Sequence, residues 1–395
     1  MKRLIFGTAA GLLAAVLFLN LPANAVSAQR AIVMDEIGNK VVYEKDADSR
    51  SLIASTTKIM TGLLVCENCN VLDRVRIPRE AVGVEGSSMY LREGEVLTIQ
   101  ELLYGMMLSS GNDAAVALAI ACGTSVEHFA DMMNEKAREL GMTQSHFENP
   151  NGLDGKEHYS TARDLGILGL EAMKNPIFAK TVSTRTVQVG DRYLRNHNKL
   201  LWRVPGADGV KTGYTRAAGR ILVSSAQRGG RRVVAVTIND PNDWQDHSTL
   251  LENAFARYGE KTLIRTGEQV GTLEVAGGEA RQVPILAARE FSGWVVPGER
   301  PMVILPGPGF TYAPVARGGS AGNAYVVLEG KVLGTIPVVY GKTVEILEEP
   351  EKSIWERWLG GKQNGETAKN TVCPGGGLPA AGGRDDQGGT NPGKR

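Results

Sequence analysis

The sequence predicts an α/β fold in which an antiparallel sheet is combined with a helical subdomain and followed by a small all-β domain. Three observations support this prediction. Short β-prone runs lie near the amino terminus, helical patterns fill the middle of the chain, and strand patterns return from about residue 184. Because the early and the late strands each form hairpins, we expect them to meet in one sheet.

The first strands lie in residues 31–46, AIVMDEIGNKVVYEKD, where two β-prone runs flank a Gly-Asn turn and predict a hairpin. A helix with an apolar face is expected to begin near Ser55. Thr98 and Glu101 then match a capping box in front of an apolar run, so a helix is predicted over 99–108.

Further helices are predicted by capping residues or by apolar residues at helical spacing. They are expected from Asp113, over 125–140, and from Thr161 toward Met173. From Thr184 onward the pattern changes to that of strands.

The late strands include the runs GVKTGYT (209–215), RILVSSAQ (220–227) and RRVVAVTI (231–238). Only Arg228-Gly229-Gly230 separates the last two, which predicts an antiparallel hairpin with the first run beside it. Residues 241–258 have the pattern of a return helix.

The composition is that of a globular protein, with 395 residues of which 42% are hydrophobic and 22% charged. This length is sufficient for two domains. The predicted segments are a signal peptide over 1–28, a domain of helices and strands over 29–259, an all-β domain over 260–348, an amphipathic membrane-associating helix over 349–362, and a disordered Gly-rich tail over 363–395. A net charge of +1 without a basic run excludes a nucleic-acid footprint.

The amino terminus has the pattern of a secretory signal peptide. A basic start precedes an apolar run from Leu4 to Leu19, and Ala23-Asn24-Ala25 or Val26-Ser27-Ala28 offers a cleavage site. The alternative is an uncleaved anchor, although the run is short for a spanning helix. We therefore expect an exported, extracytoplasmic protein, peripheral on the outer face of the cytoplasmic membrane.

The chain has four cysteines, and two of them form the pattern Cys66-x-x-Cys69. No second pair and no clustered histidines accompany them, which argues against a zinc site. In an exported protein either cysteine could form a disulfide with Cys122. Buried free thiols are an equally acceptable interpretation.

Ser55 and Lys58 lie three residues apart in LIASTTKIMTGLL (52–64) and would share one face of a helix. Serine is a weak nucleophile that needs a base, and lysine can act as one when it is neutral. Because burial and a nearby positive charge lower the pKa of an amine, a second lysine is expected close by. Taken alone, the pattern fits an N-cap serine and an exposed lysine better.

Two further motifs change this interpretation. Ser110-Gly111-Asn112 lies in a break between two apolar helices, where its side chains can point into a cleft. Lys211-Thr212-Gly213 lies on a strand beside the predicted hairpin, and Gly213 would keep the strand edge open to an extended substrate. S-x-x-K, S-x-N and K-T-G in this order are the set of motifs of penicillin-binding proteins and class A β-lactamases.

The chain resembles a low-molecular-mass penicillin-binding protein, a D-alanyl-D-alanine carboxypeptidase of the serine type. The stretches GVEGSSMYLREGE, LLYGMMLSSGNDAAVALA, ENPNGLDGKEHYSTARDL and GADGVKTGYTRAAG also resemble the family pattern in order. The resemblance covers about residues 28–258. It implies a β-lactamase/DD-peptidase-like fold over 29–259, peptidoglycan stem peptides as substrates, binding of β-lactam antibiotics, and no metal or organic cofactor.

The resemblance also implies catalytic roles. Ser55 would attack the carbonyl of the terminal D-Ala-D-Ala bond, with Lys58 as its base. Ser110 and Lys211 would pass a proton to the leaving D-Ala, and Asn112 would position Lys58 and the substrate backbone. Water would then hydrolyse the acyl-enzyme, whereas β-lactams would stay attached to Ser55.

The strand that carries Lys211-Thr212-Gly213 would bind the substrate. The backbone N–H groups of Ser55 and Tyr214 would form the oxyanion hole, and Thr212 next to Gly213 would meet the terminal carboxylate. Some relatives have a histidine where this chain has Tyr214, which should alter the rate more than the reaction. The motifs do not identify an arginine for the carboxylate, although Arg216 and Arg220 are near in sequence.

Two alternatives remain open at this point. A β-lactamase would share the motifs and would need a base for deacylation, for which Glu148 in FENPNGLD is a candidate. We interpret Glu148 as structural, because its segment matches the carboxypeptidase pattern and a β-domain follows. The other alternative is a sensor that is acylated without turnover.

The segment EKSIWERWLGG places four apolar residues on one helical face: Ile354, Trp355, Trp358 and Leu359. Tryptophans in such a position fit a helix that lies in the membrane interface. Packing against the β-domain is the alternative interpretation.

Overall fold

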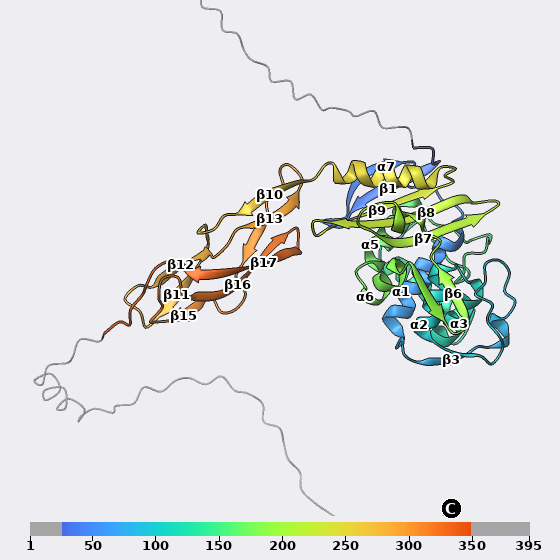
Figure 1. The fold of residues 1–395 in the computed structure, drawn as a ribbon, viewed down its shortest axis with the longest axis horizontal. Coiled ribbons are helices and arrows are strands. Elements are labelled where there is room, and N and C mark those ends of the chain that lie inside the picture. Colours follow the sequence, from blue (N-terminus) through green and yellow to red (C-terminus); the bar gives the residue numbers. More distant parts are fainter. Residues whose placement is uncertain (1–25, 349–395) are drawn as a thin grey trace, which may run out of the picture. The chain divides into compact units, whose positions relative to one another are not determined.

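The structure is a computed structural model that describes residues 26–348 (Figure 1). The predicted signal segment up to residue 25, the amphipathic helix over 349–362 and the tail over 363–395 lie outside the described residues. Val26 and Ala28 are buried, and Ser27 Oγ donates to Asp240 at 2.8 Å. Residues 26–28 are therefore part of the packed fold.

A five-stranded sheet with the order β2-β1-β9-β8-β7 forms the centre of the larger domain. β1 (Arg30–Asp35) and β2 (Lys40–Lys45) form the predicted hairpin. β8 (Gly219–Arg228) and β9 (Arg231–Ile238) form the second hairpin, with β7 (Ala207–Thr215) at the edge. β1 pairs antiparallel with β9, so the early and late strands meet in one sheet as predicted.

Helices cover both faces of this sheet (Figure 1). α7 (Asp243–Phe255), the predicted return helix, packs on one face, and α5 (Ala162–Ala172) packs on the other. Alternate residues of a strand point to opposite faces, so Ile32 enters the core beneath α5 while Val33 enters the core beneath α7. This two-sided burial explains why the strands are almost continuously apolar.

The helical subdomain follows the predicted order, and its other helices are α1 (Lys58–Asn68), α2 (Ile99–Leu108), α3 (Asn112–Gly123), α4 (Val126–Glu139) and α6 (Pro176–Ser183). The capping box of α2 is present, with both bonds between Thr98 and Glu101 formed. The sequence analysis missed α6, a single short helix whose signal is the Asn175 cap in front of Pro176.

Smaller elements connect these helices and strands: β3 (Arg74–Arg76), β4 (Val96–Thr98), β5 (Thr186–Val189), β6 (Arg192–Arg195) and the 3-10 turns η1 (Ala54–Thr57), η2 (Arg79–Ala81) and η3 (Lys199–Trp202). β5 and β6 form a hairpin of their own. Cys69 at the end of α1 forms a disulfide with Cys122 of α3, and Cys66 is buried and free.

The carboxy-terminal part of the described chain is all β. Its strands are β10 (Gly259–Ile264), β11 (Gln269–Ala276), β12 (Gln282–Ala287), β13 (Phe291–Val295), β14 (Met302–Ile304), β15 (Phe310–Tyr312), β16 (Ser320–Leu328) and β17 (Lys331–Tyr340). β10 pairs with β13, and the other six form one sheet. Their inward-facing aliphatic residues, such as Val283, Ile285 and Ile336, form a core of their own.

Candidate active site

Ser55 lies on the 3-10 turn η1, and Lys58 is the first residue of α1. The helix predicted near Ser55 therefore begins with a tighter turn. Ala54, directly before Ser55, has a left-handed φ of +45°, which costs a residue with a Cβ atom on the order of 1–3 kcal/mol. This conformation turns the chain sharply at Ser55.

Lys58 is fully buried, and its Nζ atom has three hydrogen-bonding neighbours. It lies 2.9 Å from Ser55 Oγ, 2.6 Å from Asn112 Oδ1 and 2.5 Å from the carbonyl oxygen of Asn151. Asn112 Nδ2 donates to the carbonyl of Glu85 at 2.6 Å, which fixes the amide so that its oxygen faces Lys58.

The pKa of Lys58 lies well below its ordinary value, first because the amine is buried and second because Lys211 is close; Asp113 acts in the opposite direction. A neutral amine has two N–H bonds and one lone pair. The oxygens of Asn112 and Asn151 can only accept, so they take both N–H bonds. In its neutral form Lys58 would therefore turn its lone pair toward the Ser55 hydroxyl, as a base for that proton must.

A second hydroxyl–amine pair lies beside the first. Ser110 connects α2 and α3 with a left-handed φ of +61°, and Lys211 lies on β7. Lys211 Nζ donates to Ser110 Oγ at 3.0 Å and to the carbonyl of Thr212 at 2.8 Å. Burial lowers the pKa of Lys211 to about 7. Lys211 is thus the second lysine whose presence the sequence analysis expected near Lys58.

Close packing supplies a further reason for a glycine at position 213. Gly213 is buried, and a Cβ atom there would lie 3.2 Å from the carbonyl oxygen of Ile53 and 3.3 Å from the backbone nitrogen of Ser55. The glycine therefore lets β7 approach the backbone of the η1 turn closely. This approach brings the backbone of β7 beside Ser55. The expectation that Gly213 also keeps the strand edge open to substrate stays a prediction.

The structure brings all eight predicted site residues together around one cleft. Ser55, Ser110, Thr212, Gly213 and Tyr214 line a cavity of about 320 Å³. Lys58, Asn112 and Lys211 lie behind it and reach it through the hydrogen bonds described above.

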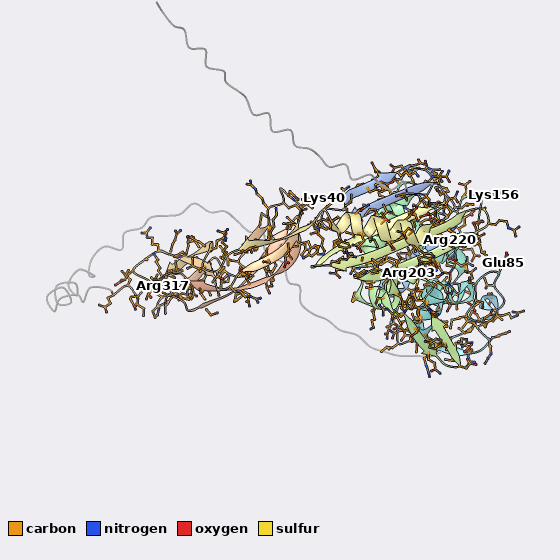
Figure 2. All side chains as sticks on the ribbon, turned by 45° about the horizontal axis from the view of Figure 1, so that its top comes forward. Lys40, Glu85, Lys156, Arg203, Arg220 and Arg317 are labelled. Atoms are coloured by element: carbon orange, nitrogen blue, oxygen red, sulfur yellow. A yellow bond between two sulfur atoms is a disulfide. The ribbon has the colours of Figure 1, made fainter. Side chains whose placement is uncertain are left out.

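The cleft also has walls that the sequence motifs did not reveal: His197, Lys199, Arg220, Asp243 and Trp244. Of the two arginines considered for a carboxylate, Arg220 lines this cavity; its side chain is labelled in Figure 2. It comes from β8 and is held by Asp243, at 2.7 Å. Sequence spacing could not have identified this residue, because its position depends on the pairing of β8 with β7.

The segment 148–152 forms the floor beneath Lys58. The carbonyl of Pro150 accepts from Thr61 Oγ1 at 2.6 Å, and the carbonyl of Asn151 accepts from Lys58. The sequence analysis missed Asn151, because a backbone carbonyl leaves no signature in residue type. Glu148 is exposed and is not among the residues that line the cleft.

Two buried histidines take part in hydrogen bonds to hydroxyls. His158 Nδ1 accepts from the backbone of Glu148 at 3.1 Å, so its Nε2 donates to Thr57 Oγ1 at 2.8 Å; burial is the main reason that its pKa falls to about 4. His247 bonds Ser224 and Thr237, and burial lowers its pKa to about 3. No group of three or more His, Cys, Asp or Glu side chains within residues 26–348 is arranged to hold a metal ion.

Family comparisons agree with this geometry. A family model described as D-alanyl-D-alanine carboxypeptidase matches residues 19–242, and a model described as the C-terminal domain of penicillin-binding protein 5 matches residues 258–346.

Individual relatives give the same result. The chain is 33% identical to the D-alanyl-D-alanine carboxypeptidase DacF of Bacillus subtilis, over 80% of this chain and 85% of that protein. It is 31% identical to DacC of Escherichia coli, over 87% and 93%. The crystal structure of penicillin-binding protein 5 from Haemophilus influenzae superposes with a TM-score of 0.58 at 27% identity, over 81% of this chain and 98% of that one. The chain belongs to the D-alanyl-D-alanine carboxypeptidase family of low-molecular-mass penicillin-binding proteins.

Proposed function

We propose that this protein is a serine-type D-Ala-D-Ala carboxypeptidase that removes the terminal D-alanine from peptidoglycan stem peptides through an acyl-enzyme on Ser55. Family membership supports the reaction and the substrate class. The observation that carries the assignment to particular residues is the contact between the Ser55 hydroxyl and the buried amine of Lys58.

In the first step, Ser55 Oγ attacks the carbonyl carbon of the D-Ala-D-Ala bond and its proton passes to Lys58. The negative charge that develops on the carbonyl oxygen is stabilised by the backbone N–H groups of Ser55 and Tyr214, because donors already held in place need no reorganisation when the charge forms. The close approach that Gly213 permits supports this pairing of donors from η1 and β7.

In the second step, the C–N bond breaks and the proton that Lys58 took from Ser55 is relayed to the leaving amine through Ser110 and Lys211, which are 3.0 Å apart. A group with a pKa of about 7 can both give and take a proton near neutral pH, and Lys211 has this property. Thr212, with Arg220 beyond it, faces the terminal carboxylate. Water then attacks the ester and gives one proton to the neutral amine of Lys58, which returns it to Ser55 Oγ as the acyl–oxygen bond breaks and the shortened peptide leaves as a carboxylate.

D-Alanine release tests this proposal directly. We expect wild type to release D-alanine from an N-acylated Lys-D-Ala-D-Ala peptide and Ser55→Ala to release none, while penicillin adds one adduct to wild type at Ser55. An adduct without release would indicate the sensor alternative. Rapid hydrolysis of penicillin without a lasting adduct would indicate a β-lactamase.

Membrane association is a separate proposal: the protein is exported and lies on the outer face of the cytoplasmic membrane through residues 349–362. The signal-peptide pattern and the apolar face of EKSIWERWLGG support it. Because residues 26–28 pack into the fold, cleavage after Ala25 fits better than cleavage after Ala28. Among the helices of residues 26–348, none is long and apolar enough to cross a bilayer. If a chain ending at Glu351 partitions with membranes as well as the full chain does, this proposal fails.

A further inference from the structure

Val26 and Ser27 pack against the start of α7. Val26 is buried in the core beneath this helix. The backbone N–H of Ser27 donates to Asp246 Oδ2 at 2.6 Å. The Ser27 hydroxyl lies 2.8 Å from Asp246 Oδ2 and also 2.8 Å from Asp240 Oδ1. We call Ser27, Asp240 and Asp246 the amino-terminal clamp.

The amino-terminal clamp has more acceptors than donors. A hydroxyl has one proton, so Ser27 Oγ can donate to only one of the two carboxylates at a time. Asp240 is fully buried, and its Oδ2 atom has no hydrogen-bond partner within residues 26–348. In the same part of the chain neither Asp240 nor Asp246 takes part in an ion pair. A buried carboxylate needs a cation or further donors, and the clamp lacks both.

Cleavage of the signal peptide after Ala25 creates such a cation beside the clamp. Water breaks the C–N bond between Ala25 and Val26, which leaves a carboxylate on Ala25 and an ammonium group on Val26. This ammonium has three N–H bonds and a positive charge, whereas the amide of the uncleaved chain has one N–H bond and no charge. Because neighbouring backbone nitrogens are roughly 3–4 Å apart, the ammonium would lie within roughly 6 Å of Asp246 Oδ2. An opposite charge at this distance favours the ionised form of a group.

The other titratable groups around Val26 leave room for this pairing. Lys45 Nζ donates to the carbonyls of Val26 and Ala28, at 2.9 and 2.6 Å. In a trans peptide the carbonyl of Val26 and the N–H of Ser27 point to opposite sides, so Lys45 and Asp246 lie on opposite sides of this peptide. The pKa of Tyr43 is raised by burial and further by Asp246, so this side chain stays uncharged near neutral pH.

The amino-terminal clamp is connected to the catalytic cleft through Asp240. Its backbone N–H donates to the carbonyl of Arg220 at 3.0 Å, and its Oδ1 atom accepts from the backbone of Asn242 at 3.0 Å. Asp243, the next residue and the first of α7, holds the Arg220 side chain at 2.7 Å. Asp240 therefore contacts both the start of the mature chain and the segment that positions Arg220 in the cleft.

We propose that the ammonium group of the mature Val26 binds the carboxylates of Asp240 and Asp246, so that removal of the signal peptide fixes residues 240–243 and with them Arg220. This inference rests on the export proposed above. The ligand of the clamp is the processed terminus of the chain itself. A chain that keeps its signal peptide has no charge at Val26 and holds Arg220 less firmly.

The test first determines the amino-terminal residue of the exported protein by sequencing. The chain 26–395 with a free Val26 amine is then compared with the same chain preceded by Gly-Gly, which displaces the ammonium by about 7 Å. Both forms are made as wild type, Asp240→Asn and Asp246→Asn. Asp131→Asn is the matched control, because Asp131 is an exposed carboxylate on α4. Urea unfolding and D-alanine release from an N-acylated Lys-D-Ala-D-Ala peptide are measured for each protein.

We expect the exported protein to begin at Val26. The Gly-Gly extension should raise the equilibrium constant for unfolding by about tenfold in wild type and in Asp131→Asn, since an opposite charge nearby shifts a pKa by about one unit or more. The extension should have an effect below about threefold in Asp240→Asn and Asp246→Asn, which have lost one of the two carboxylates. In extended wild type the KM for the peptide should rise by about threefold without a change in kcat, because Arg220 binds substrate less well.

A second measurement uses wild type alone and does not depend on the folding of any variant. The pH dependence of labelling by an amine-selective reagent gives the pKa of the Val26 amine, which we expect above about 9, against about 7.7–8.0 for an ordinary amino terminus. An ordinary pKa, an equal effect of Gly-Gly in all four proteins, or an exported protein that begins at another residue would overturn the proposal. An unchanged KM beside a raised pKa would overturn only the connection to Arg220. Absence of D-alanine release from every chain would overturn the proposed function, while labelling and unfolding would still decide whether the clamp binds the terminus.

Discussion

Replacing Lys58 with methionine tests the central feature of the site. Methionine has a similar length and no amine, so Ser55 would lose its base while the buried volume is nearly kept. General-base catalysis contributes about 10²–10⁴ in rate. At about 1.4 kcal/mol for each factor of ten, this corresponds to a barrier higher by roughly 3–5 kcal/mol.

The same substitution should lower the free energy of unfolding only modestly. It leaves Asn112 Oδ1 and the carbonyl of Asn151 without the donor that Lys58 provides. A buried acceptor without a partner costs about 1–3 kcal/mol, and part of this is offset because an amine no longer has to be desolvated. We therefore expect Lys58→Met to fold, with a modest decrease in the free energy of unfolding.

The assay is the rate constant for acylation by a fluorescent penicillin, measured together with urea unfolding. Lys156→Met is the control, because Lys156 is an exposed lysine (Figure 2). We expect Lys58→Met to be acylated about a thousandfold more slowly and Lys156→Met at the wild-type rate. A folded Lys58→Met protein that is acylated within tenfold of wild type would refute the assignment of Lys58 as the base.

Three other predictions concern the packing and charge around the site. Gly213→Ala should slow acylation by about tenfold or more with little loss of stability, because its Cβ atom would press on the backbone of the Ser55 turn; an unchanged acylation rate would contradict this. The pKa of Lys211 is about 7 in the folded protein, below its ordinary value of 10.5, so the folded state binds fewer protons in this interval. We therefore compare the free energy of unfolding of wild type with that of Lys211→Met. The difference should stay level below pH 7 and rise between pH 7 and 10.5, by up to about 1.4 kcal/mol per pH unit. A difference that falls with pH would show that the pKa of Lys211 is shifted the other way. Replacing Cys69 and Cys122 with serine should lower the free energy of unfolding by about 2–4 kcal/mol without changing acylation of the folded protein, and equal urea midpoints would show that the disulfide contributes nothing.

Most elements could be predicted because their signals are local. The capping box at Thr98 fixed the start of α2, and the short Arg228-Gly229-Gly230 turn fixed the β8–β9 hairpin. α6 was missed because its sequence signal is confined to the Asn175 cap in front of Pro176, and such a cap is weak evidence for a helix in a segment of mixed polarity. The 3-10 turn before α1 was also missed, since it depends on the left-handed conformation of Ala54, which alanine rarely adopts.

By itself, the sequence determined which chemical groups are available and on which local elements they lie. A hydroxyl and an amine three residues apart, a second hydroxyl in a helix break and a lysine on a strand are all properties of short segments. These segments are enough to indicate the family and the reaction.

Only the tertiary structure decided what state those groups are in. Burial among the packed sheet and helices lowers the pKa of both Lys58 and Lys211, and the nearby Lys211 lowers the pKa of Lys58 further. Asn151 and Arg220 enter the site through a backbone carbonyl and through strand pairing, neither of which residue type encodes. Burial and long-range proximity are properties of the folded chain, since residues far apart in sequence acquire a common environment only when it folds.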